Sequence, residues 1–185
     1  MKWSVLFVVI VLCNAMPGEV SAQRYLPGMR GIQLTAGIAP KDGLYAGFAF
    51  SQYTRRTDRW LIGVEYLEKR HNYKMTDIPQ AQLTLDAGYY LKCLSNWRKT
   101  FVVSLGLSAV GGYETVNWNR KLLDDGATIA NKDGFLYGGA LTLETELYLS
   151  NRIVLLAGVR ERLLDGSSVG KFQTLAGLGV KIIIN

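Results

Sequence analysis

The sequence predicts an all-β protein, an eight-stranded antiparallel up-and-down β-barrel of the outer-membrane type. Apolar residues occupy every second position in eight successive segments, as expected of strands with one apolar face. The alternate positions are rich in glycine. No segment after Gln23 approaches the ~20 consecutive apolar residues that a membrane-spanning helix needs. Together these features favour a barrel whose apolar face points outward.

The chain has 185 residues, of which 49% are hydrophobic, and a formal net charge of +6. This length suits one domain. The unbroken apolar run Val5–Cys13, with Lys2 before it and the small residues Val20–Ala22 after it, matches a secretory signal peptide. We therefore expect a signal peptide at residues 1–22 and a single barrel domain at residues 23–185. The exported chain keeps one cysteine, Cys93, so no intramolecular disulfide is expected.

The first four predicted strands lie between Gly31 and Ser95. In the first, apolar residues occupy every second position from Ile32 to Ile38. The next three strands have outward apolar positions at Ala46, Phe48 and Phe50, then at Trp60, Ile62, Val64 and Tyr66, then at Leu83, Leu85, Ala87 and Tyr89. Each of these runs alternates in the manner of a strand with two different faces.

The last four predicted strands follow the same rule, with one irregular member. The segment Ile153–Arg162 is less regular and carries Gly158 and Arg160 on one face. The apolar positions of the other three strands are Phe101, Val103, Leu105, Leu107 and Ala109, then Tyr137, Leu141, Leu143 and Leu147, then Ala176, Leu178, Val180, Ile182 and Ile184. An even number of strands is typical of bacterial outer-membrane barrels.

The composition of the polar face separates a membrane barrel from a soluble β-sandwich, which also alternates. Glycine weakens a strand that faces solvent but fits the crowded, curved inside of a narrow barrel. We therefore expect glycines and hydroxyl groups to fill the inside. The glycines on this face are Gly47, Gly63, Gly88, Gly106, Gly138, Gly158, Gly177 and Gly179. Aromatic residues near strand ends could form interfacial girdles: Trp60, Tyr66, Tyr89, Phe101, Tyr113, Phe135 and Tyr137.

The lengths of the connections agree with termini in the periplasm, where turns are short and outward loops longer. The predicted periplasmic turns are Thr54–Asp58, Ser95–Lys99 and Ser150–Asn151. The predicted outward loops are Glu68–Pro79, Glu114–Lys132 and the intermediate Asp165–Gly170, whereas Pro40–Gly43 is short. Eight strands leave an interior that side chains fill, so a wide pore is not expected.

Charged residues on the inward face form a predicted polar network: Glu65, Asp86, Glu144, Glu146, Arg160 and Lys181. These groups should pair, because an isolated buried charge is costly. We hypothesise that Arg160 neutralises Glu144 or Glu146. The network could form a proton or ion path, but a plug of salt bridges is the expected arrangement in so narrow a lumen.

The segment Glu114–Lys132 is the most distinctive predicted outward loop. It combines an aromatic residue with polar and charged ones, and we hypothesise an outward contact site made of Asn117, Trp118, Arg120, Asp124 and Asp125. Loops on rigid scaffolds commonly carry binding. The solubility of an exposed loop would also explain its polar residues.

Catalysis, metal binding and cofactor binding find little support in the sequence. The only histidine, His71, lies in a predicted loop, and no Ser/His/acid arrangement can be justified. A lipid-modifying barrel hydrolase would need such a triad and is kept as an alternative. The basic residues near the turns are Arg55, Arg56, Arg59, Arg98 and Lys99. Lipid headgroups explain them as well as DNA does, so no direct nucleic-acid binding is expected.

Segments along the whole exported chain resemble the TraO family of conjugative-transposon transfer proteins: Gln23–Gly31, Gly88–Lys92, Gly112–Trp118, Asp125–Thr128, Tyr137–Ala140, Arg152–Leu156 and Gly166–Phe172. The resemblance implies a component of the conjugative DNA-transfer apparatus in the envelope of Gram-negative bacteria, without catalytic residues. The expected partners are outer-membrane lipid and other transfer proteins. A soluble periplasmic β-domain of the same apparatus is the alternative.

Overall fold

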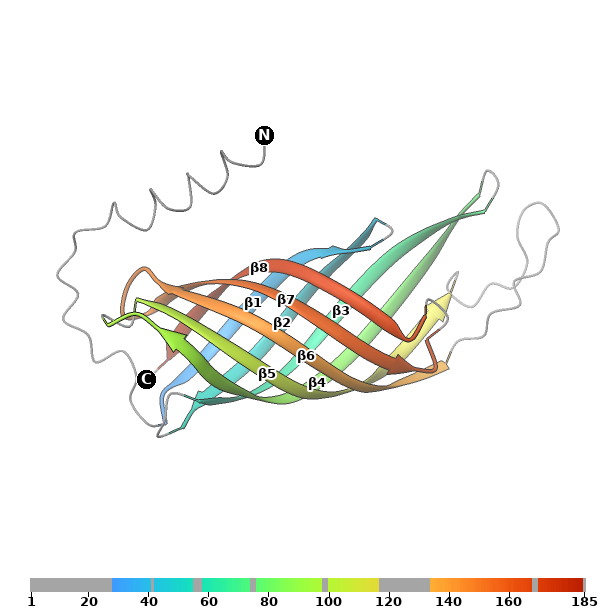
Figure 1. Cartoon of the computed structure of the whole chain (residues 1–185). Helices are drawn as coiled ribbons and strands as arrows, with labels where there is room; N and C mark the ends of the chain where they lie inside the picture. Colours follow the sequence, from blue (N-terminus) through green and yellow to red (C-terminus); the bar gives the residue numbers. More distant parts are fainter. Residues whose placement is uncertain are drawn as a thin grey trace.

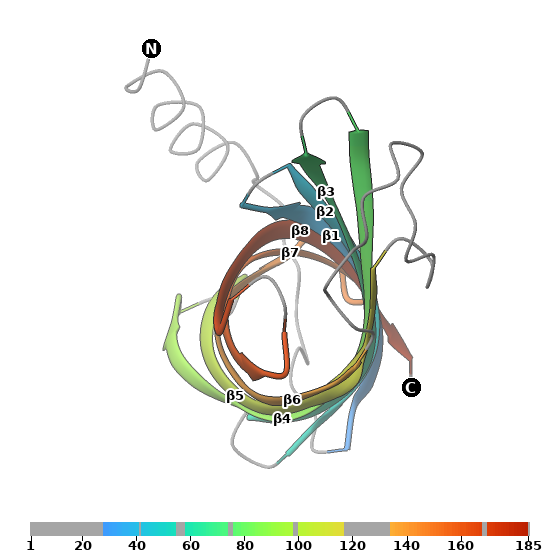
Figure 2. The ribbon, with the colours of Figure 1, turned by 90° about the vertical axis from the view of Figure 1, so that its right-hand side faces the viewer.

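The computed structural model describes residues 28–40, 42–54, 58–73, 76–97, 100–116, 134–167 and 170–184. Eight strands pair antiparallel in chain order, and β8 pairs with β1 to close the ring (Figure 1; Figure 2). The strands are β1 Arg30–Ala39, β2 Gly43–Tyr53, β3 Arg59–Tyr73, β4 Thr76–Ser95, β5 Phe101–Val116, β6 Gly134–Tyr148, β7 Ile153–Asp165 and β8 Phe172–Ile184. The predicted eight-stranded up-and-down barrel is therefore confirmed. The described residues include no apolar helical segment of membrane-spanning length.

The barrel has two different ends (Figure 1). The start of β1, the end of β8 and the connections β2–β3, β4–β5 and β6–β7 lie at one end, here called the terminal end. The ends of β1, β3, β5 and β7 and the starts of β2, β4, β6 and β8 lie at the other, here called the distal end. The expected signal peptide, residues 1–22, lies outside the described residues.

The segment Glu68–Pro79, expected as a loop, is instead a β-hairpin that projects from the distal end (Figure 1). Strands β3 and β4 remain paired up to Tyr73 and Thr76, although β2 pairs with β3 only as far as Glu68. His71 pairs with Ile78 in this hairpin rather than lying in a loop. Backbone pairing between two strands needs no alternation of side chains, so the periodicity of the sequence did not indicate this extension.

The outer wall is apolar on every strand. One residue from each strand, at least 50% exposed, illustrates this: Leu34, Phe48, Ile62, Leu85, Leu107, Leu143, Val159 and Leu178. The alternate residues point into the lumen, as the buried positions of each strand show. The predicted glycines share the register of these inward positions. The polarity of the barrel is thus reversed relative to a soluble protein.

Inward glycines make room for tyrosine rings. A Cβ atom on Gly106 would lie 2.5 Å from the ring of Tyr90, and one on Gly177 would lie 2.2 Å from the hydroxyl of Tyr45. Both distances are too short for a real side chain, because buried atoms are already closely packed. The glycine face of the strands is therefore the surface on which larger lumen side chains lie.

The lumen also holds bulky aliphatic residues, which differs from the expectation of glycines and hydroxyl groups alone. Leu67 and Leu175 pack with Ala39, and Leu136 and Leu164 pack with Val110 and Ala140. A third cluster at the terminal end comprises Met29, Tyr53, Val102, Tyr148, Val154, Leu156 and Ile183. Glycines on some strands leave volume that larger residues from the facing strands fill, because protein interiors are close-packed.

Candidate functional site: the polar network of the lumen

All six residues of the predicted network lie in the lumen: Glu65, Asp86, Glu144, Glu146, Arg160 and Lys181. Arg59 on β3 and Arg162 on β7 complete the set of ion pairs. Each of these side chains occupies an inward position of its strand. The eight residues divide into two clusters along the barrel axis.

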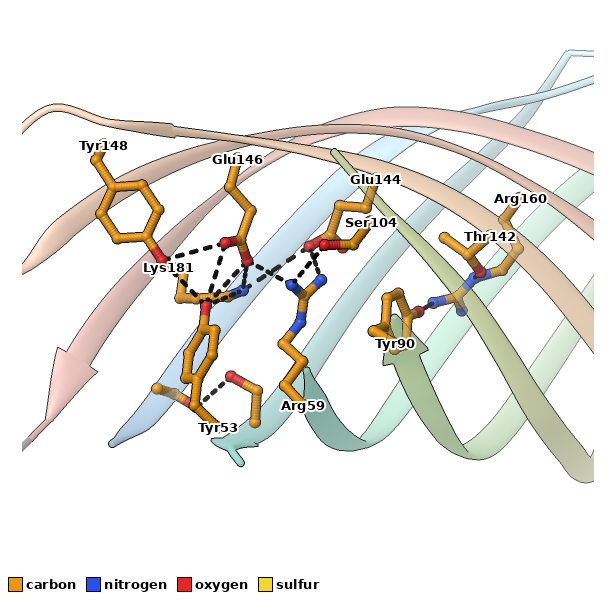
Figure 3. A network of polar contacts seen from close by, with 12 residues as sticks. Tyr53, Arg59, Tyr90, Ser104, Thr142, Glu144, Glu146, Tyr148, Arg160 and Lys181 are labelled. Carbon is orange, nitrogen blue, oxygen red and sulfur yellow. Dashed lines mark hydrogen bonds and ion pairs between the residues drawn. The ribbon is translucent and has the colours of Figure 1, made fainter. Parts of the chain in front are cut away.

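The terminal cluster contains Arg59, Glu144, Glu146 and Lys181 (Figure 3). The guanidinium of Arg59 lies 2.5 Å from Oε1 of Glu144 and 2.7 Å from Oε1 of Glu146. The ammonium of Lys181 contacts Glu146 and lies 3.8 Å from Oε1 of Glu144. Strands β3, β6 and β8 supply these groups, so the cluster ties three parts of the wall together.

Two tyrosine hydroxyls donate hydrogen bonds to the buried Glu146 carboxylate (Figure 3). Tyr53 donates to Oε1 at 3.0 Å and Tyr148 donates to Oε2 at 3.1 Å. Lys181 also donates to the hydroxyl of Tyr53 at 3.2 Å. A buried charge is tolerated only when it is paired and hydrogen-bonded, and Glu146 meets both conditions.

The distal cluster contains Glu65, Asp86, Arg160 and Arg162. Arg160 lies 2.8 Å from Oε2 of Glu65 and 3.6 Å from Oδ2 of Asp86, while Arg162 contacts the other oxygen of Glu65. Arg160 also donates from Nε to the hydroxyl of Thr142 at 3.0 Å. Glu65 is therefore held between two guanidinium groups that come from the same strand.

The hypothesis that Arg160 neutralises Glu144 or Glu146 is wrong. Those carboxylates pair with Arg59 and Lys181, whereas Arg160 reaches across the lumen from β7 to Glu65 on β3. On the wall itself Arg160 lies beside Thr142, not beside a carboxylate. Closure of the ring decides the pairing, because it brings distant strands face to face across a narrow lumen.

Tyr90 connects the two clusters (Figure 3). The guanidinium carbon of Arg59 lies 4.6 Å from the centroid of the Tyr90 ring, within range of a cation–π contact. The hydroxyl of Tyr90 accepts a hydrogen bond of 3.1 Å from Arg160. Each cluster holds two cations and two carboxylates, so the connected network carries no formal net charge.

The position of Arg59 differs from the one expected from the sequence. From the sequence, Arg59 is expected near a turn, among basic residues that could meet lipid headgroups. The structure buries it, with a side chain 1% exposed. The position of Arg59 in β3 could have indicated its burial. It is two residues before Leu61 and therefore shares the inward face of β3 with Leu61, Gly63 and Glu65. Arg162 could have been found in the same way, since it lies two residues after Arg160.

A cavity of about 40 Å³ adjoins the distal cluster, with Gln33, Tyr45, Glu65, Asp86 and Arg160 among its lining residues. This volume admits a few water molecules, each of which needs roughly 10–15 Å³ of this kind of space. Within the described ranges, Oε1 of Gln33 and Oδ2 of Asp86 have no hydrogen-bond partner. Water in this cavity could satisfy both oxygens.

Polar groups also close the distal mouth. In Figure 2 the distal ends of β7 and β8 curve into the ring. The hydroxyl of Ser167 donates to Glu114 on β5 at 3.1 Å and accepts from Gln173 on β8 at 3.0 Å. Gln82 on β4 donates to the same carboxylate at 2.6 Å. Ser167, two residues after the end of β7, is thus held across the opening by side chains of β5 and β8.

The predicted outward contact residues Asn117, Trp118, Arg120, Asp124 and Asp125 lie outside the described residues. Of the predicted loop Glu114–Lys132, the first three residues belong to β5. Among the side chains that are described, no group of three His, Cys, Asp or Glu could hold a metal ion.

The chain matches the model of one known protein family. The family described as conjugative transposon protein TraO matches residues 26–184. The chain has no match among curated proteins. The solved structures similar to it include three bacterial proteins. Neisserial surface protein A has 12% identity and a TM-score of 0.47, covering 83% of this chain and 94% of that one. The N-terminal β-barrel domain of Pseudomonas aeruginosa OprF has 13% identity and a TM-score of 0.49, covering 85% and 98%. The Yersinia pestis attachment invasion locus protein Ail has 10% identity and a TM-score of 0.49, covering 85% and 99%.

Proposed function

Because this chain belongs to the TraO family of conjugative transposon proteins, we propose that it is a non-enzymatic outer-membrane barrel of the transfer apparatus. It would act there as a structural or interaction component together with other transfer proteins. The observation that carries the proposal is the reversed polarity of the barrel, which is apolar outside and ionic inside.

The outer wall supports a place in lipid. Soluble proteins rarely expose continuous apolar surface beyond a few hundred Å², whereas here exposed apolar side chains occur on all eight strands. A closed ring leaves no unpaired strand edge, which lipid requires. Exposed aromatic residues occur towards both ends, with Trp60 near the terminal end and Tyr113 and Phe135 near the distal end. These features count against a soluble periplasmic domain.

The paired state of the lumen supports a structural rather than a catalytic or conducting function. Its carboxylates and cations form ion pairs with one another, and tyrosine hydroxyls are used in the same network. Apolar side chains pack at the terminal end beyond these clusters. A filled interior is typical of eight-stranded barrels. For these reasons we favour a sealed scaffold over a proton path or a lipid-modifying enzyme.

The β4–β5 hairpin at the terminal end is the candidate contact with other transfer proteins. Its register shifts at Cys93, between Lys92 and Leu94. Beyond this bulge it presents Leu94, 66% exposed, and Trp97, 97% exposed. The carboxylate of Asp58 fixes the base of the hairpin, since it accepts a hydrogen bond of 3.1 Å from the Lys92 backbone amide. Exposed Leu94 and Trp97 above a fixed base are suited to binding, because large aromatic residues dominate interface energetics.

The test combines location with transfer. In cells that lack the native gene, the wild-type chain should fractionate with the outer membrane, migrate heat-modifiably and restore transfer. The variant L94S/W97A should fold equally well but lower transfer at least tenfold and lose co-purification with periplasmic transfer proteins. A matched control, S95A, changes a neighbouring exposed residue without removing apolar surface.

Two outcomes would count against the proposal. Recovery of the chain as a monodisperse soluble protein without detergent would contradict membrane insertion. Normal transfer by L94S/W97A, together with loss of transfer when only residues 117–133 are trimmed, would favour an alternative role in which the distal loop meets the recipient surface.

A further inference from the structure

The side chains of β7 that point away from the lumen include one carboxylate, Glu161. Positions Ile153, Leu155, Ala157 and Val159 are apolar, Glu161 follows them, and Leu163 continues the row. Leu163 on β7 and Phe172 on β8 are exposed register partners, and they lie farther towards the distal end than Glu161. Glu161 therefore lies inside the apolar outer surface of the barrel and not at its distal edge. The barrel wall by itself has no need of a charge at this position.

The neighbours of Glu161 leave its charge uncompensated. Its register partners are Leu141 on β6 and Thr174 on β8. The hydroxyl of Thr174 donates to Oε2 of Glu161 at 2.6 Å. In the described part of the chain, no cation lies within ion-pairing distance of this carboxylate. A charge on the lipid face of a barrel is destabilising, and an ionisable group at membrane depth usually has a functional partner.

The surroundings of Glu161 are suited to close contact with another protein. Two of its four diagonal neighbours are small, Gly139 on β6 and Ala176 on β8, and the other two, Leu143 and Phe172, are large and exposed. Small residues allow close packing of membrane segments. Just beyond Glu161 lie the three most exposed aromatic residues among the described strand side chains: Phe135, Tyr137 and Phe172. The polar pair Glu161–Thr174 is therefore bordered on its distal side by large, exposed aromatic side chains.

We propose that the β6–β8 face centred on Glu161 and Thr174 is a lateral interface that binds an apolar membrane segment carrying one Lys or Arg. The proposal rests on the membrane location argued above. Charge complementarity selects this occupant. A symmetric second copy would bring two Glu161 carboxylates together, and lipid phosphates are anions that the carboxylate repels.

The binding test uses the full chain in lipid vesicles and a synthetic leucine–alanine peptide of about 20 residues, long enough to span the membrane. The peptide carries one Lys in the half that matches the distal end, and a matched peptide carries Gln there. Energy transfer between labelled peptide and barrel should report at least tenfold tighter binding of the Lys peptide. E161Q and E161L should abolish this preference. The control T145L, which removes an outward polar group elsewhere on β6, should retain it.

Equal binding of the two peptides to the wild-type chain, or an unchanged preference in E161L, would overturn the proposal. In cells, E161L should fold as well as wild type and lower transfer at least tenfold. Normal transfer by E161L would also overturn it. So would misfolding of E161L, because Glu161 would then serve the barrel itself. Failure of the proposed function has a different signature, namely normal transfer when the whole chain is deleted.

Discussion

Glu146 has four polar partners in the lumen, because Arg59, Lys181 and two tyrosine hydroxyls surround its carboxylate. Replacing it by Gln would leave two cations facing the single charge of Glu144. We expect E146Q to lower the free energy of unfolding by about 3–5 kcal/mol, the usual cost of breaking a buried ion pair. Urea titration in lipid vesicles measures this. T145A, on the outward side of the same strand, is the control, and a loss for E146Q no larger than that of T145A would contradict the assignment.

The pairing of Arg160 can be tested by double-mutant cycles. Arg160 contacts Glu65 at 2.8 Å, while Glu144 belongs to the other cluster. We expect R160A and E65A to be coupled by about 1–3 kcal/mol, as is usual for groups in one network. R160A and E144A should be closer to additive. Unfolding of the single and double variants in the same vesicles gives both values, and stronger coupling to Glu144 than to Glu65 would reverse the assignment.

At the residue scale, the sequence predicted which side chains enter the lumen better than it predicted their partners. Glu65, Asp86 and Lys181 follow directly from alternation along their strands. Arg59 was missed because it adjoins a turn that contains Arg55 and Arg56, so its basic neighbours masked its inward register. The partner of Arg160 could not be predicted, since contacts across the lumen depend on the shear of the closed ring rather than on local sequence.

At the scale of the strand, Gly106 on β5 is a position where packing depends directly on glycine. The three atoms nearest to a Cβ there all belong to the ring of Tyr90, the closest at 2.5 Å, and Tyr90 connects Arg59 with Arg160. We expect G106A to destabilise the barrel by about 1–3 kcal/mol, the usual cost of overpacking. Its cost should shrink in a Tyr90→Ala background, where the ring is absent.

The matched control for G106A lies on the same strand. Gly111 points outward, and a Cβ there would meet nothing closer than 4.0 Å. G111A should therefore leave the free energy of unfolding nearly unchanged in the same vesicle assay. Equal effects of G106A and G111A would show that strand propensity, and not the Tyr90 ring, decides the outcome.

The strands themselves were predicted well where lipid-facing and lumen-facing residues must alternate. All eight segments are strands, and the short connections at the terminal end agree with expectation. The projecting β3–β4 hairpin was missed because its residues lie beyond the barrel wall, where neither face has to be apolar. Likewise, the inward bend between β7 and β8 rests on contacts of Ser167 with Glu114 and Gln173, which come from other parts of the chain.

At the scale of the whole molecule, the lumen is blocked in layers. An apolar cluster that includes Val102 and Ile183 occupies the terminal end, two neutral ionic clusters follow, and aliphatic clusters lie beyond them. The Ser167 contacts close the distal mouth. An ion crossing this interior would have to lose its hydration without a continuous polar lining, which is strongly unfavourable.

We therefore expect the purified chain to insert into planar bilayers without stepwise ionic conductance. A wide porin of 16 strands, whose lumen is an aqueous channel, serves as the positive control. Insertion must be established independently, by the heat-modifiable migration of protein recovered from the same membranes. If insertion is established, the absence of conductance steps supports a sealed scaffold. Discrete conductance steps that disappear in variants of Arg160 or Glu65 would instead show that the distal cluster and its cavity belong to an ion path, and that the interior opens further than its ion pairs indicate.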